Sequence, residues 1–240
     1  MASGKAILGG LVGRFLFREA RVGRVRELSP HFRWLEVGGE DLRDVEWSPG
    51  DKVQVFLPGI GMRTYTPLVW DSMLGSTQFL VYLHGNSPGA QWGRTLKLGD
   101  RCQLFGPRDS LPLDSLEGPV VLFGDETSFA VGHTLKSAKV PSTDISRVFE
   151  VSSATESLSV LSSLDMGDAC LVERRPSDAH LAEVESKLRT ALQQHGRANL
   201  VLTGRAQSIQ TLRARLRTSP IPFATQKVKA YWSEGKVGLD

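Results

Sequence analysis

The first half of the chain alternates apolar and polar residues in short runs that are separated by Gly, Pro and Asp. Such alternation is typical of strands that bury one face in an antiparallel barrel or sandwich. One short helix is expected at residues 90–96, where Pro88 suits the first turn. The runs predict five or six strands, at residues 21–28, 32–37, 52–57, 63–70, 78–84 and 102–105.

The pattern changes after a link at residues 109–118. Residues 119–123 form a continuous apolar run of the buried parallel-strand type, and a helical stretch follows at 128–139. Asp178 is expected to cap a helix with one apolar face, and another helix carries Ile209, Leu212 and Leu216. The apolar face of the first of these helices consists of Leu181, Val184, Leu188, Ala191 and Leu192. Further strands are expected at 146–151, 169–172, 199–202 and 223–232.

The predicted fold class is therefore β followed by α/β. Residues 15–112 form an N-terminal antiparallel β-barrel, and residues 118–240 form a three-layer α/β domain. Residues 1–14 precede both as a flexible leader. Because many unrelated proteins place a small β domain before an α/β domain, the motifs must decide the function.

Composition and charge narrow the classes of protein. The chain has 240 residues, of which 40% are hydrophobic and 23% charged, so it can bury a core. Lys and Arg number 29 against 26 Asp and Glu, which gives a net charge of +3 and a pI near 9.0. Acidic and basic residues are interleaved, whereas nucleic-acid binders carry a dense basic stripe or tail. We expect no nucleic-acid partner.

Cysteine and histidine usage argues against a disulfide framework or a metal site. Cys102 and Cys170 lie far apart without a CxxC motif, and the histidines lack metal-ligand spacing. We therefore expect a cytoplasmic protein in a reducing compartment. The apolar stretch at residues 6–12 is interrupted by Arg14 and Arg18 and is shorter than the roughly 20 residues that a membrane span needs. This favours a leader over an anchor, and we expect a monomer without membrane insertion.

The sequence Arg63-Thr64-Tyr65-Thr66 has the chemistry of a flavin site. An arginine can pair with a pyrophosphate through its planar fork. Tyr65 lies two positions along the same strand face and can contact an isoalloxazine ring, while Thr66 can offer hydrogen bonds near the ring edge. The alternative is an ordinary exposed strand that contains an aromatic residue.

Further motifs follow in a characteristic order: His84-Gly85, SPGAQW at 87–92, Gly99-Asp100, GPR at 106–108 and VVLFGDET at 120–127. In this order the chain resembles the siderophore-interacting protein family, the FAD-containing ferric-siderophore reductases of ferredoxin-reductase type. The segment SPHFRWLEVGGEDL and the pair Tyr231-Trp232, followed by Gly235, add to the resemblance. It spans about residues 15–236.

The resemblance implies an FAD held between the two domains, reduced by NADPH or NADH, with electrons passing to ferric iron in a siderophore. The helix start at Gly89 would offer N–H groups to the diphosphate, as helix N-termini do for anions. No side chain need act as a catalytic acid or base, because the cofactor carries the chemistry. The resemblance assigns cofactor binding to Arg63, Thr64, Tyr65, Thr66, His84, Gly85, Gly89, Ala90, Trp92, Asp125, Thr127 and Trp232.

Asp125 and Thr127 stand between a strand and a helix, where open α/β sheets bind ligands. The family uses this turn near the nicotinamide nucleotide. The alternative is that Asp125 and Thr127 only cap the helix.

Several positions depart from the family pattern. Ser87 and Ala90 stand where a Gly and a hydroxyl residue are usual, and Phe129 occupies a helix start that commonly carries a Pro. Arg205 follows Gly204 where the family has an acidic residue. This arginine is expected either to pair with a nucleotide 2′-phosphate or to be a solvated surface charge.

An anionic ferric chelate would be bound by cations. Arg205 and the two lysines of the last strand, Lys227 and Lys229, are the predicted substrate-binding residues. Arg174, Arg175 and Lys236 are further candidates, and for each the alternative is an ordinary solvated charge.

Three functions remain as hypotheses. The first is an FAD-dependent ferric-siderophore reductase. The second is an FAD-dependent biosynthetic enzyme on the same fold, acting on an organic substrate with a degenerate NAD(P)H site. The third is a binding protein without catalysis, against which the intact Arg63, Tyr65 and Thr66 argue.

Overall fold

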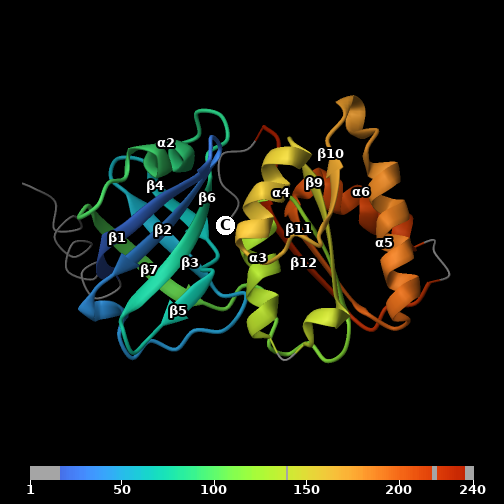
Figure 1. Cartoon of the computed structure of the whole chain (residues 1–240), viewed down its shortest axis with the longest axis horizontal. Coiled ribbons are helices and arrows are strands. Elements are labelled where there is room, and N and C mark those ends of the chain that lie inside the picture. The colour runs from blue at the N-terminus through green and yellow to red at the C-terminus, as the bar shows by residue number, and fades with distance from the viewer. Residues whose placement is uncertain (1–16, 139, 218–220, 236–240) are drawn as a thin grey trace, which may run out of the picture.

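The computed structural model describes residues 17–138, 140–217 and 221–235 and contains two β-sheets side by side (Figure 1). The first sheet is antiparallel, and the second is parallel and flanked by helices. This order confirms the predicted β and α/β fold class. The predicted leader at residues 1–14 lies outside the described residues.

The antiparallel sheet has seven strands in the order β4-β3-β7-β1-β2-β6-β5. Its hydrogen-bonded order runs from β4 on one side to β5 on the other, and among the described strands no ladder joins β4 to β5. The strands are β1 (Phe17–Ser29), β2 (Phe32–Gly38), β3 (Lys52–Leu57), β4 (Gly61–Tyr65), β5 (Val69–Asp71), β6 (Ser76–Tyr82) and β7 (Arg101–Arg108).

The single strand predicted at residues 63–70 is wrong: the structure divides it into β4 and β5. Pro67 lies between them and has no N–H to donate to a ladder, so the chain leaves the sheet there. Thr66, Pro67 and Leu68 thus connect the two edges of the sheet. The predicted short helix is present as α2 (Pro88–Thr95).

Helix α2 packs closely on β6 because Gly93 has no side chain. A Cβ atom at Gly93 would lie 2.7 Å from Val81 and 2.8 Å from Leu83. Beneath the helix, one face of the sheet buries Val53, Val55 and Phe79 completely. The rigid core of the first sheet therefore fixes the position of α2.

The parallel sheet has the order β10-β9-β8-β11-β12. From β8 the chain adds β9 and β10 on one side and then β11 and β12 on the other, so the strand order reverses at β8 and β11. The strands are β8 (Val120–Gly124), β9 (Ile145–Val151), β10 (Cys170–Glu173), β11 (Asn199–Arg205) and β12 (Gln226–Trp232). The helices are α3 (Phe129–Thr134), α4 (Ala154–Ser163), α5 (Leu181–His195) and α6 (Ala206–Arg217).

The helices form the two outer layers of this unit. Helices α3 and α4 face the antiparallel sheet, and α5 and α6 cover the far side (Figure 1). The predicted apolar face of α5 is confirmed, since all five of its residues are buried. The expected cap is wrong: α5 begins at Leu181, and Asp178 instead bonds to Arg205. Helix α4 was not predicted.

The two sheets share a hydrophobic core. Phe129 at the start of α3 is fully buried and stacks on Phe32 of β2, with ring centroids 5.5 Å apart and planes 3° apart. Phe149 meets Phe129 edge-on at 4.9 Å. The unusual Phe129 therefore anchors the α/β unit on the first sheet. Near this contact, the His31 N–H donates to Glu156 of α4 at 2.9 Å.

Within the described part of the chain, every helix is too short or too polar to cross a bilayer. The same residues contain no group of three His, Cys, Asp or Glu side chains placed to hold a metal ion.

Candidate functional site

Arg63 and Tyr65 lie on the same face of β4, opposite Val55 and Val53 of β3. The N-terminus of α2 approaches both side chains: a Cβ atom at Gly89 would lie 3.0 Å from the Tyr65 hydroxyl oxygen and 3.7 Å from Arg63 Cγ. The Tyr65 ring packs on Trp92, with centroids 5.4 Å apart. The structure therefore brings together four of the predicted cofactor residues.

The first turn of α2 is capped by its own sequence. The Ser87 hydroxyl oxygen accepts a hydrogen bond from the Ala90 N–H at 3.3 Å, and the Gln91 N–H bonds to the Ser87 carbonyl at 2.9 Å. Because Pro88 has no N–H group, the first N–H of this turn belongs to Gly89. It comes before the N–H groups that form hydrogen bonds within the helix. The Ser87 hydroxyl thus binds the Ala90 N–H, one of the N–H groups that the sequence assigns to a diphosphate. Gly89 lies beside Arg63.

Thr64 points to the other face of β4. Its hydroxyl oxygen accepts a hydrogen bond from the Gln54 side chain at 3.5 Å, and Gln54 is also bonded by Arg108. The side chain of Thr64 is exposed. Within the Arg63–Thr66 motif, the structure places the Thr64 side chain away from Tyr65 and α2.

His84 and Gly85 form the loop between β6 and α2. The exposed His84 ring stacks on Tyr82, with centroids 5.5 Å apart. Partial burial lowers the pKa of His84, and the nearby Glu126 carboxylate opposes this effect. Tyr82 donates to Glu126 at 3.3 Å, so this loop adjoins the α/β unit.

Asp125 occupies the reversal point of the parallel sheet, directly after β8, and is fully buried. Its Oδ1 accepts hydrogen bonds from the Thr127 N–H at 2.9 Å and from the Thr127 hydroxyl at 2.5 Å. Its Oδ2 accepts one from Trp232 Nε1 at 2.7 Å. Gly204, at the end of β11, leaves room for this carboxyl, because a Cβ there would lie 2.5 Å from Asp125 Oδ2. The capping bonds that the sequence left as an alternative are thus present.

Trp232 and its neighbour Tyr231 connect this carboxyl to the flavin-type motif. Burial strongly raises the pKa of the Tyr231 phenol, and the nearby Thr66 side chain opposes the rise, although the buried hydroxyl has no hydrogen-bond partner. Thr66 follows β4 directly. The end of β12 therefore lies between the strand that carries Arg63 and the reversal point that carries Asp125.

A network of buried charges lies beside Asp125. Arg174 forms two bonds to the Glu126 carboxylate, at 2.6 and 3.0 Å, and also donates to the Ser152 hydroxyl at 2.9 Å. Glu126 accepts a further bond from the Ser152 N–H at 2.6 Å. Burial acts to lower the pKa of Arg174, but the hydrogen bond to Glu126 and the charges of Glu126, Asp125 and Glu150 together outweigh it, so the pKa is raised.

Glu150 extends this network into the interior of the α/β unit. It is fully buried, bonds to His180 Nε2 at 2.8 Å and accepts from the Ser208 hydroxyl at 2.7 Å. This cluster was not predicted from the sequence. A usable signal was present, since Glu150 interrupts an otherwise apolar strand end where a charge must have partners.

The predicted substrate cations do not form one cluster in the structure. Arg205 is buried and pairs with Asp178 at 2.5 Å and Glu234 at 2.9 Å, so it is not a solvated charge. Lys227 donates to Ser115 at 3.1 Å. Lys229 lies two residues further along the edge strand β12. Arg175 pairs with Glu183 on the surface, and Lys236 lies outside the described residues.

Burial raises the pKa of Asp125 from 3.8 to about 6, the Glu126 charge adds to the rise, and the Thr127 and Trp232 hydrogen bonds oppose it. Between these two values the folded protein holds a proton that the unfolded chain has lost. Stability should therefore fall as the pH rises from about 4 to about 6. The raised pKa of Asp125 contributes at most about 3 kcal/mol to the free energy of unfolding, because one pKa unit corresponds to roughly 1.4 kcal/mol.

Urea unfolding of the wild type and of Asp125→Asn at pH 4, 5, 6 and 7 measures this effect. The difference between the two proteins cancels the other titrating groups that they share. We expect the wild type to lose stability relative to Asp125→Asn over this range. A constant difference would contradict the assignment.

An antiparallel sheet followed by a parallel sheet with a reversal point is the ferredoxin-reductase-like fold. Phthalate dioxygenase reductase has this fold and is described as a modular structure for electron transfer from pyridine nucleotides to a 2Fe-2S centre. It shares 14% identity with this chain, with a TM-score of 0.69, over 93% of this chain and 70% of its own.

Within this class, residues 59–111 match the family model of the siderophore-interacting FAD-binding domain. A siderophore utilization protein from T. fusca shares 24% identity, with a TM-score of 0.70, over 93% of this chain and 95% of its own. The siderophore-interacting protein SipS from Aeromonas hydrophila shares 17%, with a TM-score of 0.71, over 92% and 93%. The predicted family resemblance is thus confirmed. None of the curated proteins matches the chain in sequence.

The residues present fit an FAD. Because Gly89 has no side chain, the N-terminus of α2 can lie against Arg63 and Tyr65, where a Cβ atom would crowd the Tyr65 hydroxyl. The Tyr231 hydroxyl is buried at the other end of the motif, beside Thr66. A cation and a helix N-terminus suit a diphosphate, and aromatic rings with a buried hydroxyl suit a flavin.

Proposed function

We propose that this protein is an FAD-dependent oxidoreductase that takes electrons from NADPH or NADH and passes them to ferric iron in a siderophore. The observation that carries the proposal is the convergence of Arg63, Tyr65 and Gly89 within the segment that matches the siderophore-interacting FAD-binding domain. The ferredoxin-reductase-like fold supports the electron-transfer chemistry.

Each residue has a binding or orienting role in this proposal. Arg63 and the Gly89 N–H hold the diphosphate, and Tyr65 and Thr66 bind the ring system. Tyr231 and Trp232 close the site from the α/β side and exclude water from it. The chemistry that FAD supplies when bound is acceptance of a hydride and release of single electrons, so two ferric ions are reduced for each NAD(P)H oxidised.

One observation favours a second candidate, an FAD-dependent enzyme that acts on an organic substrate without NAD(P)H. At the reversal point, where a dinucleotide would bind, Asp125 is covered by Trp232 and Arg205 is neutralised by two carboxylates. Neither Asp125 nor Arg205 is free to contact a nucleotide in this arrangement.

Anaerobic mixing separates the two candidates. Purified protein saturated with FAD is mixed with NADPH or NADH, and the flavin absorption band is followed. Under the first candidate one of the nucleotides bleaches the band, and a ferric catecholate then restores it. Failure of both nucleotides to bleach the band would favour the second candidate.

A flavin-free protein that neither binds added FAD nor gains thermal stability from it would overturn both candidates.

A further inference from the structure

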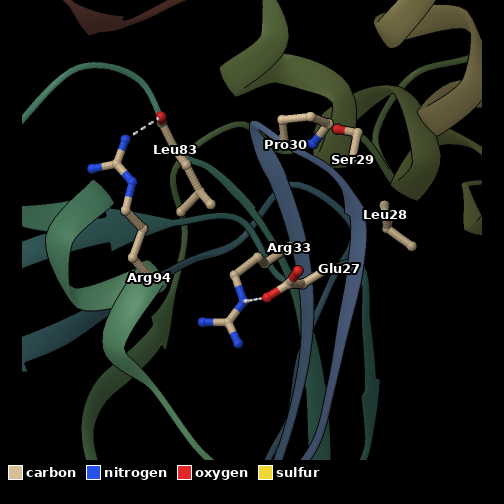
Figure 2. Close-up of a pocket in the computed structure, with 7 residues that line it drawn as sticks. All are labelled: Glu27, Leu28, Ser29, Pro30, Arg33, Leu83 and Arg94. Atoms are coloured by element: carbon tan, nitrogen blue, oxygen red, sulfur yellow. Dashed lines mark hydrogen bonds and ion pairs between the residues drawn. The ribbon is translucent and has the colours of Figure 1, made fainter.

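A pocket of about 460 Å³ lies between the β1–β2 hairpin and the C-terminal half of α2 (Figure 2). Its volume falls within the range of small-molecule sites. Seven residues line it: Glu27, Leu28, Ser29, Pro30, Arg33, Leu83 and Arg94. The region that fits FAD lies at the opposite end of α2, at Ser87–Gly89 beside Tyr65. None of the residues that line the pocket is one of the predicted cofactor residues.

Arg33 places an incompletely paired cation in the wall of this pocket. The residue is only 9% exposed, and its Nη1 donates to the Gly93 carbonyl. Its Nε is buried and has no hydrogen-bond partner. The Glu27 carboxylate lies 3.9 Å from that Nε, and the Glu27 side chain is 79% exposed. A buried charge is costly unless it is closely paired, and water weakens the contribution of Glu27.

Arg94 adds a second guanidinium on the α2 side of the pocket. Its Nη2 donates to the Leu83 carbonyl at 2.8 Å, and the side chain is exposed (Figure 2). Leu28, Pro30 and Leu83 provide apolar surface in the lining. With Glu27, the lining carries a net charge of +1, since two arginines oppose one carboxylate.

We propose that this pocket binds a small organic anion, whose phosphate or carboxylate group pairs with Arg33 and Arg94 and whose apolar body lies on Leu28, Pro30 and Leu83. Guanidinium groups pair with both kinds of anion through two parallel hydrogen bonds. Glu27 competes with the ligand for Arg33. This site goes beyond the proposed oxidoreductase function and does not depend on it.

Calorimetric titration of the FAD-saturated protein with phenyl phosphate and with benzoate tests the proposal. The two probes share a phenyl body and differ in the anion, so the tighter one identifies the source of the negative charge. We expect saturable binding of at least one probe, weakened by added NaCl because part of the site is exposed.

Three variants at exposed positions test the site, because two of them should change the affinity in opposite directions and the third should not change it. Arg94→Gln should weaken binding about tenfold through the loss of one charge-assisted hydrogen bond. Glu27→Gln should tighten it about threefold, because the competing carboxylate is removed. Arg24→Gln is the matched control, since Arg24 is an exposed arginine of β1 that does not line the pocket. It should leave the affinity unchanged.

Absence of saturable binding for both probes would overturn the proposal. So would affinities of Arg94→Gln and Glu27→Gln that equal that of Arg24→Gln. The FAD content of each protein is measured separately from its absorption spectrum. A failure of the flavin proposal is thus distinguished from a failure of the anion site.

Discussion

Replacing Arg174 with methionine should lower the free energy of unfolding by about 3–5 kcal/mol, the usual cost of removing one partner of a buried ion pair. The Glu126 side chain is only 2% exposed and would lose its closest partner. Methionine retains most of the aliphatic length, so lost packing contributes little. Urea unfolding at neutral pH measures the change.

The neighbouring arginine provides a matched control. Arg175 pairs with Glu183 on the surface, where the two side chains are 56% and 41% exposed. Arg175→Met should therefore change stability by less than about 1 kcal/mol. Adding Glu126→Gln to Arg174→Met should recover part of the loss, because the unpaired charge is then gone. Equal effects of Arg174→Met and Arg175→Met would refute the network.

Replacing Arg63 with alanine should weaken FAD binding about 10- to 100-fold, as expected for the loss of a charge-assisted contact to a diphosphate. Arg63 lies beside Gly89, whose N–H is the other group placed to meet that diphosphate. The measurement is a fluorescence titration of the flavin-free protein with FAD.

Thr64→Val is the control for this prediction, because it changes the next residue of the same strand. The Thr64 hydroxyl faces Gln54, so its removal should alter the FAD affinity less than about twofold. If Thr64→Val weakens FAD binding as much as Arg63→Ala, the motif does not bind the cofactor through one strand face. The assignment of Arg63 to the diphosphate would then be wrong.

Periodicity in the sequence predicted the elements whose burial is regular. The apolar stripe of α5 repeats at helical spacing, and every position of it is buried. Helix α4 was not predicted because only Ser157, Val160 and Leu161 are buried in it. Three residues form too short a buried stripe to be recognised in the sequence. The division of residues 63–70 depended on Pro67, whose effect on strand pairing outweighs the β-forming residues around it.

The site could be predicted where neighbours in sequence act together. Arg63 and Tyr65 share a strand face by simple alternation, and Gly89 opens a helix within the same segment. The charge pairs could not be found in this way. Glu126 and Arg174 are 48 residues apart, and Arg205 finds Asp178 across 27 residues. Which cation meets which carboxylate is decided by the order of strands in the parallel sheet, which a single sequence does not encode locally.

The position of Tyr231 and Trp232 has a consequence for the time at which the site forms during folding. Trp232 bonds to Asp125 across 107 residues of chain, whereas all strands of the first sheet lie within Phe17–Arg108. Contacts between distant residues form slowly, because long loops must close first. The antiparallel sheet can therefore assemble while the cofactor site is still open. In the proposed assignment the site becomes complete only when β12 joins the parallel sheet, so the ability to retain FAD would mark a late event in folding.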